Sequence, residues 1–349
     1  RLTATADLIA AEGLTLDLGG APARGSLALR LAPEPRLDLA LIASRLELDG
    51  WIGALRGGPR GWPVSLDIAV EAAAYAGVTL RRVRGIASVE EGRLTLTDVS
   101  LLLPGETEID LAGVTAGGRL EIAARFAGPD IRAALDALGL PVDGLDATLL
   151  RRGEGRFRLV LEEAQAAVQD LAASIEGLRV TGAGTLRYGP RPALGVGLNL
   201  DRLDLLRWMP GGIDLNAASR ALGAVDLNLR LGAERATLGE AVLERATLDA
   251  AVENGRVTLR RLSGRLAETD VAVSGTAVLG AQTRLQEVTI DASGPAARGL
   301  MALLPGGWPD RAPIAAMPVA LRVSGAGPLE ALALRGTAEL GELRAEATG

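Results

Sequence analysis

Aliphatic and polar side chains alternate along much of this chain, and the alternation limits the fold more than any other feature of the sequence. In residues 225–231, aliphatic side chains occupy every odd position and polar side chains every even one. Residues 37–44 and 119–126 follow a similar pattern. Successive side chains of a β-strand point to opposite faces, so each run places its aliphatic side chains on one face. The sequence therefore predicts a mainly β protein whose sheet has one apolar face.

The chain also repeats itself with a period of about 160 residues. Trp51 and Trp208 stand 157 positions apart, and residues 90–96 correspond to residues 253–259 at an offset of 163. Equivalent segments follow one another in the same order in both copies. We therefore expect a first unit at residues 1–156, a second at 157–316, and the start of a third at 317–349, where the chain stops within a repeat.

Helices are expected to be few and short. The pattern predicts a helix over residues 129–140, its repeat partner over 295–304, and a short helical turn at 203–209. Residues 161–174 favour helix by composition, but the repeat aligns them with a strand-like segment near the start of the chain. We interpret them as a strand. Asn254-Gly255 is the strongest hairpin signal, because both residues tolerate the positive φ of a type I′ turn.

The residue types in the chain exclude several kinds of site. The chain has no His, no Cys and no Lys, so all 37 basic residues are Arg. Imidazole and thiolate nucleophiles or metal ligands, and lysine-dependent sites, are therefore impossible within it. The net charge of −6 argues against a nucleic-acid partner. We expect no catalytic residue, no metal site and no cofactor.

A one-sided apolar sheet of this length needs a cover that two or three short helices do not provide. A second sheet would form a sandwich, closure of the sheet on itself would bury the face, and a curved open sheet would leave a trough for a hydrophobic ligand. Hydrophobic residues make up 48% of the chain but aromatic residues only 2%. Smooth aliphatic side chains suit alkyl chains better than bases or sugar rings.

Several degenerate motifs resemble the AsmA-like family of Gram-negative envelope proteins, which includes the TamB and YhdP branches. They are the run that ends at Trp208-Met209-Pro210, residues 253–259 followed by Leu262-Ser263-Gly264, Gly275-Thr276-Ala277, and Gly128-Pro129-Asp130 before a short helix. The resemblance covers most of the chain. It implies a long curved antiparallel sheet that forms a groove, with a few short helices, and that carries phospholipid between the inner and outer membranes in support of outer-membrane biogenesis. It also implies a periplasmic location with an inner-membrane anchor outside this chain.

If the sheet forms such a groove, aliphatic side chains of the alternating runs would line it. The candidates are Leu37, Leu39, Leu41, Leu120, Ile122, Phe126, Val225, Leu227, Leu229, Leu231, Val271 and Val273. The competing interpretation is a purely structural repeat, a stalk or surface sandwich, in which these side chains form a closed core.

Two further groups of residues are candidate sites. The matched tryptophans Trp51 and Trp208 are expected to be packing anchors rather than ligand contacts. The carboxylate pairs Glu90-Glu91 and Glu162-Glu163 are expected to lie in solvent, because neighbouring side chains of a strand diverge and do not converge on one cleft.

Overall fold

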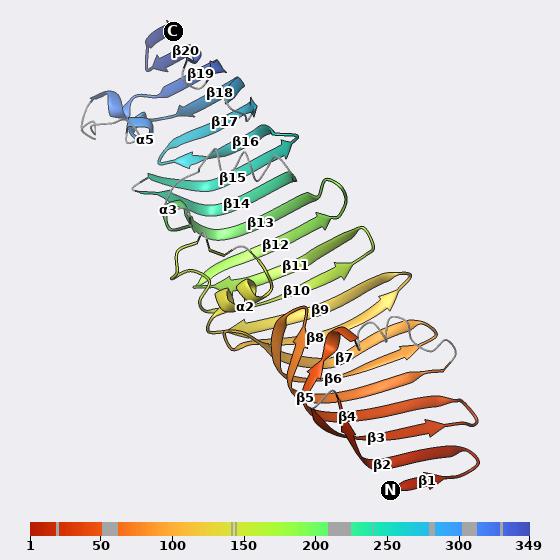
Figure 1. The fold of residues 1–349 in the computed structure, drawn as a ribbon. Coiled ribbons are helices and arrows are strands. Elements are labelled where there is room, and N and C mark those ends of the chain that lie inside the picture. Colours follow the sequence, from red (N-terminus) through yellow and green to blue (C-terminus); the bar gives the residue numbers. More distant parts are fainter. Residues whose placement is uncertain are drawn as a thin grey trace. The chain divides into compact units, whose positions relative to one another are not determined.

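The computed structural model describes most of the chain as two compact units of β-strands. The units are Arg1–Gly177 and Leu178–Gly349. The mainly β class predicted from the alternation is confirmed (Figure 1). The described residues are 1–18, 21–50, 62–140, 142–143, 145–208, 225–239, 241–278, 283–301, 313–328 and 331–349.

In the first unit, strands pair with their neighbours in chain order (Figure 1). Their bounds are β1 (Leu2–Ala4), β2 (Leu8–Asp17), β3 (Pro22–Arg30), β4 (Arg36–Glu47), β5 (Val64–Tyr75), β6 (Val78–Glu90), β7 (Arg93–Leu103), β8 (Thr107–Ala116), β9 (Arg119–Gly128), β10 (Gly153–Leu161) and β11 (Gln165–Ile175).

The second unit has the same kind of order. Its strands are β12 (Leu178–Arg187), β13 (Ala193–Asp204), β14 (Asp226–Leu238), β15 (Ala241–Glu253), β16 (Arg256–Leu266), β17 (Thr269–Val278), β18 (Arg284–Gly294), β19 (Val319–Pro328), β20 (Ala333–Leu340) and β21 (Leu343–Thr348).

One pair of strands in each unit is parallel, which the expectation of an antiparallel sheet did not include. β4 pairs with β5, and β13 pairs with β14, in the parallel direction. The links between these strands are longer than the tight turns elsewhere, and a parallel pair needs such a link to bring the chain back to its starting side. The other pairs recorded within the units are antiparallel.

The internal repeat is present in the strands themselves. β13 begins and ends 157 positions after β4, and β15 and β16 begin and end 163 positions after β6 and β7. The irregularities repeat as well: the register breaks between Arg81 and Arg84 in β6, and between Glu244 and Thr247 in β15, at equivalent positions. The residue boundaries at 156 and 316 stay predictions, since the compact units divide instead between Gly177 and Leu178.

The predicted helix of the first unit forms as α2 (Ile131–Ala137). Asp130 is its N-cap, and its Oδ1 accepts a hydrogen bond from the Ala133 amide at 3.3 Å. Pro129 therefore precedes the cap and is not the first helical residue. In the second unit the described helices are α3 (Leu205–Trp208), α5 (Arg298–Met301) and the 3₁₀ turn η1 (Pro313–Ala316).

Two local predictions are confirmed. Most of the segment with helix-favouring composition, residues 165–174, lies in strand β11, because its backbone groups pair with β10. Pairing with a neighbouring strand outweighs intrinsic propensity here. Asn254 and Gly255 form the tight turn between β15 and β16, with φ of 51° and 74°, which are the values a type I′ turn requires.

The two ends of the strands differ within each unit. At one end, here called the helix rim, lie α2 in the first unit and α3 and α5 in the second (Figure 1). At the opposite end, here called the hairpin rim, described turns such as 91–92, 117–118 and 254–255 join the strands directly. The helix rim therefore has a layer of extra packing that the hairpin rim lacks in the described part of the chain.

A buried threonine fastens the chain at the helix rim of each unit. Thr269 is fully buried, and its hydroxyl donates to the carbonyl of Ala296 at 3.0 Å. Thr107 occupies the equivalent position, is 2% exposed, and donates to the carbonyl of Asp130 at 3.4 Å. Each hydroxyl thus ties the start of a strand to the segment that follows the next strand.

We expect Thr269→Val to destabilise the protein by about 1–2 kcal/mol, since it keeps the side-chain volume but leaves the buried Ala296 carbonyl without its donor. Thr107→Val should cost less, because its hydrogen bond is longer. The midpoints of urea unfolding for the two variants measure the effect. Equal midpoints for Thr269→Val and the unchanged protein would show that this hydroxyl does not fasten the rim.

Candidate functional site

The register of the first unit aligns aliphatic side chains into a continuous row across its strands. Residues that pair directly across neighbouring strands lie on the same face of a sheet. Beginning at Leu39 and following each pair outwards gives one residue on every strand from β1 to β11. This central row of the first unit is Leu2, Ala11, Leu27, Leu39, Leu66, Ala87, Leu96, Gly113, Ile122, Leu159 and Val168.

The second unit has an equivalent row. Beginning at Leu229, direct pairs run in both directions, and Val288 continues the row by packing against Gly275. The central row of the second unit is Gly184, Val196, Leu229, Ala250, Leu259, Gly275, Val288, Gly325 and Leu334. Both rows consist of Leu, Ile, Val, Ala and Gly, so each unit has an uninterrupted aliphatic face.

The structure brings most of the predicted groove residues onto these faces. Leu39, Ile122 and Leu229 belong to the central rows. Beside them towards the hairpin rim lie Leu37, Leu120 and Leu227, and towards the helix rim lie Leu41, Phe126, Leu231, Val271 and Val273. Their contact with lipid stays a prediction.

Two of the predicted residues lie apart from the accessible part of the face. Leu41 is 6% exposed and belongs to a buried cluster with Ala43 and Val70, so protein already covers it. Val225 precedes β14 and belongs to no strand. Alternation alone does not separate Leu41 from Leu39, because both occupy the same face and differ only in distance from the helix rim.

Burial of the apolar face changes from one rim to the other. In the helix-rim half of the first unit, Ala43, Leu46 and Leu80 are less than 9% exposed. In its hairpin-rim half, the row that contains Leu37 is half-exposed on every strand from β2 to β11. The second unit shows the same gradient, from buried Ala236 and Leu266 to Leu186 and Leu194, which are 38% and 37% exposed.

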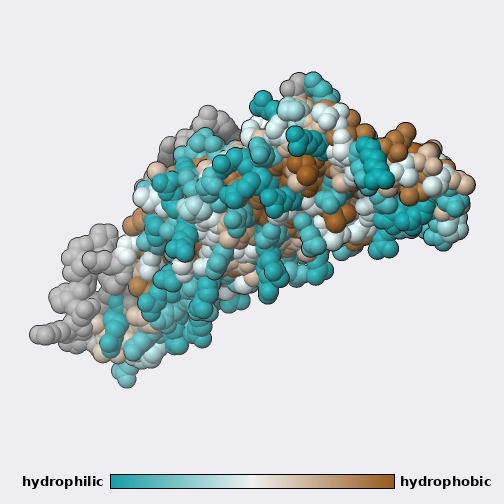
Figure 2. All heavy atoms as spheres, turned by 90° about the horizontal axis from the view of Figure 1, so that it is seen from below, coloured by the Kyte–Doolittle hydropathy of each residue, from teal (hydrophilic) through white to brown (hydrophobic). Residues whose placement is uncertain are grey.

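The hairpin-rim half of the apolar face therefore remains open. Within each unit the described strands belong to one sheet, and no second sheet of the described residues packs on its apolar face. Figure 2 shows apolar side chains reaching the surface in patches among hydrophilic ones. Apolar surface left in water costs about 25 cal/mol per Å² relative to burial, so a cover for this strip would be favourable.

Glycines allow neighbouring strands to approach closely in both units. A Cβ at Gly85 would lie 2.7 Å from Cγ2 of Val99, and a Cβ at Gly182 would overlap the carbonyl oxygen of Gly197. Neighbouring atoms thus fill the space that a larger residue would need. Glycine at a bend and a nearby bulge are the usual means of curving a sheet.

Several residues of the central rows were missing from the sequence-based set. They include Leu66, Leu96 and Leu159 in the first unit and Val196, Leu259 and Val288 in the second. The repeat contains the signal that would have found them: Leu66 lies 163 positions before Leu229, and Val196 lies 157 positions after Leu39.

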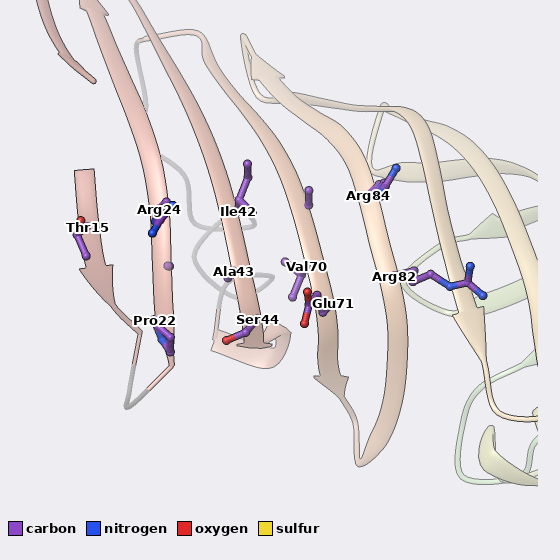
Figure 3. A pocket seen from close by; sticks show the side chains of 12 residues that line it. Thr15, Pro22, Arg24, Ile42, Ala43, Ser44, Val70, Glu71, Arg82 and Arg84 are labelled. Carbon is purple, nitrogen blue, oxygen red and sulfur yellow. The ribbon is translucent and has the colours of Figure 1, made fainter. Parts of the chain in front are cut away.

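The opposite face of the first unit is mainly polar and carries a shallow depression of about 630 Å³ (Figure 3). A second registered row crosses it, with Arg24, Ile42, Ala69 and Arg84 on β3 to β6. Ile42 is 66% exposed. Arg24 and Arg84 are separated by three strand spacings, or roughly 14 Å. These two arginines therefore do not converge on one small ligand.

Several charges at the hairpin rim form ion pairs. Arg36 contacts Asp38 at 2.8 Å, and Arg119 contacts Glu121 at 3.0 Å. In the second unit, Nε of Arg191 donates to Oδ1 of Asp226 at 2.6 Å. The rim is therefore polar and holds both signs of charge side by side.

Asp226 joins two turns of the hairpin rim. The hydrogen bond from Arg191 lowers the pKa of the Asp226 carboxyl below its ordinary value of 3.8, and the amide of Asn254 lowers it further, while partial desolvation acts in the opposite direction. The ionised carboxylate is thus favoured by folding.

We expect Asp226→Asn to lower the unfolding midpoint at pH 7. A carboxyl with a lowered native pKa contributes stability above its unfolded pKa and loses that contribution as the pH falls through its native pKa. The difference between the variant and the unchanged protein should therefore shrink below about pH 4. Urea unfolding at pH 7 and in the acid range, with exposed Asp7→Asn as the control, measures it. A difference that is independent of pH would contradict the assignment.

The alternative sites considered in the sequence do not form clefts. Glu90 and Glu91 are exposed. The carboxylate of Glu162 accepts a hydrogen bond from Nε2 of Gln165 at 2.8 Å and forms an ion pair with Nε of Arg119 at 3.9 Å. Among the described residues no group of three or more acidic side chains is arranged to hold a metal ion. Trp208 is half-buried in α3, whereas Trp51 lies outside the described residues.

Comparison of the chain with protein-family models, with curated proteins and with solved structures gives no match. None of the helices in the described part of the chain is both long enough and apolar enough to span a membrane.

Proposed function

We propose that this chain holds the acyl chains of lipids on its apolar face and carries out no covalent chemistry. One observation supports this most. Each unit has an apolar face that contains a registered aliphatic row, and the hairpin-rim half of that face remains half-exposed. Each methylene of a lipid that leaves water contributes about 0.8 kcal/mol. An acyl chain on this face would therefore be stabilised along its whole length.

The continuity of the rows supports transfer as well as holding. Residues of one chemical kind follow one another from strand to strand at roughly 4.8 Å, without a charged residue between them. A lipid that moves from one strand to the next exchanges similar contacts, so the free energy changes little along a unit. A face of this kind suits a conduit better than a pocket for one ligand.

The resemblance to the AsmA-like family extends this proposal to a cellular setting. In that setting the chain would be part of a periplasmic protein that is anchored in the inner membrane and conducts phospholipid towards the outer membrane. The aliphatic, bent face is what such a conduit requires. Absence of His, Lys and Cys supports a role without catalysis.

The rival is a structural repeat whose apolar face is closed by protein. The clusters at the helix rim favour a partial core of that kind. The open hairpin-rim half weighs against a complete one.

Gentle purification of the protein, followed by extraction and mass spectrometry of its bound lipids, tests the proposal. We expect acyl lipids to remain bound at a reproducible ratio to protein. Protein that carries none, and that gains no stability when phospholipid is added, would favour the structural repeat.

A further inference from the structure

The helix rim of the apolar face is closed in both units. In the first unit, Leu46, Ala73, Leu80 and Leu103 form one buried cluster with Ala134 of α2. In the second unit, small buried side chains pack in the same half of the face: Ala233, Ala236 and Ala246 pack with Leu203, and Ala297 and Ala315 pack with Val319 and Leu340. A polar group pushed towards this rim would enter dry protein without a partner.

The hairpin rim has the opposite character. Its apolar side chains are half-exposed or exposed, as at Leu186 and Leu194. The ion pairs Arg36–Asp38 and Arg119–Glu121 lie at this end of the strands on the opposite, polar face, and exposed ion pairs such as Arg298–Glu268 lie at the helix rim as well. What separates the two rims is therefore the burial of the apolar face: a polar headgroup stays in water at the open hairpin rim, whereas buried clusters enclose it at the helix rim.

We propose that lipid lies along the strands with its headgroup at the hairpin rim and its acyl ends towards the helix rim, and that it enters and leaves each unit over the hairpin rim. The inference rests on the proposed function, and adds the orientation of the lipid and the side of access. Acyl ends contact the central row and stop at the buried clusters, while the headgroup stays in water at the open rim.

The chain offers matched labelling positions for a test, because it has no native cysteine. Glu91 and Ala76 are exposed turn residues at the two ends of β6, with φ of 50° and 49°. Glu91 lies at the hairpin rim and Ala76 at the helix rim. β6 has 13 residues, so the two positions are roughly 40 Å apart along the strand.

The experiment attaches a bimane fluorophore to Glu91→Cys or Ala76→Cys and adds phosphatidylcholine with a nitroxide on either the headgroup or the end of an acyl chain. We expect the headgroup nitroxide to quench the label at position 91 several-fold more than the label at position 76. Asn254→Cys and Ala267→Cys, at the ends of β16 with φ of 51° and 53°, repeat the comparison if one of the first variants folds poorly.

The outcomes separate the orientation from the proposed function. Equal headgroup quenching at both rims, or stronger quenching at position 76, would overturn the orientation while acyl quenching still showed lipid on the protein. No quenching by either nitroxide, in protein that also retains no lipid on purification, would overturn the proposed function and the orientation with it.

Discussion

Replacing Leu39 and Leu229 by Asp should remove most bound lipid while leaving the protein folded. Both side chains belong to the central rows and are half-exposed. A carboxylate can therefore reach water in the empty protein, but it would lose that hydration under an acyl chain. The penalty is about 1–3 kcal/mol at each site, which corresponds to about a tenfold or greater loss of affinity.

The matched control places the same charges on the opposite face of the same strands. Ala40 directly follows Leu39, and Asn228 directly precedes Leu229. Both are exposed on the polar face. Ala40→Asp with Asn228→Asp should retain lipid as the unchanged protein does, measured by mass spectrometry of extracts. Similar lipid loss in both double variants would point to a non-specific charge effect, and unfolding of the leucine variant alone would indicate an ordinary closed core.

Gly294→Ala should strongly destabilise the second unit. A Cβ at position 294 would lie 2.6 Å from the carbonyl oxygen of Glu268 and 2.8 Å from Cα of Thr269. Both are backbone atoms at the buried helix rim, so they cannot move aside cheaply. We expect a loss of about 2–4 kcal/mol in the free energy of unfolding.

Gly197→Ala is the control, because a Cβ there has no atom within 4 Å and the glycine has no unusual φ. It should leave the urea midpoint unchanged or raise it slightly, since alanine reduces the freedom of the unfolded chain. If the two variants had equal midpoints, the tight approach of the strand end at Gly294 would not be a stabilising feature of the fold.

Local sequence patterns predict the strands and the tight turns of this protein well. The alternation in residues 225–231 becomes β14, and Asn254-Gly255 becomes a turn with two positive φ angles. These features depend on neighbouring residues only. The repeat adds the strand assignment of β11, where composition points to helix.

The parallel pairs and the bulges could not be predicted in the same way. Whether β5 pairs with β4 in a parallel or antiparallel direction depends on the path of the link between them. Arg82 and Arg245 have φ of 50°, a conformation that arginine rarely adopts outside a bulge, so their residue type gives no signal.

For the candidate site, the sequence predicts which face each residue occupies but not how deeply it is buried. Alternation assigns Leu37, Leu39 and Leu41 to one face, and the structure agrees. It does not indicate that Leu41 is covered by protein and Leu37 is open, because the gradient arises from the bend and from packing at the helix rim. Both depend on residues that are distant in the sequence, such as Ala134.

Photo-crosslinking with a phospholipid that carries a diazirine near the end of an acyl chain tests the central claim most directly. Peptide mapping by mass spectrometry then locates the attached residues. The account predicts crosslinks on the apolar face, at central-row residues such as Leu39, Leu96, Leu229 and Leu259, in both units. Crosslinks spread equally over polar-face neighbours such as Ala40 and Asn228, or no crosslinks at all, would contradict it.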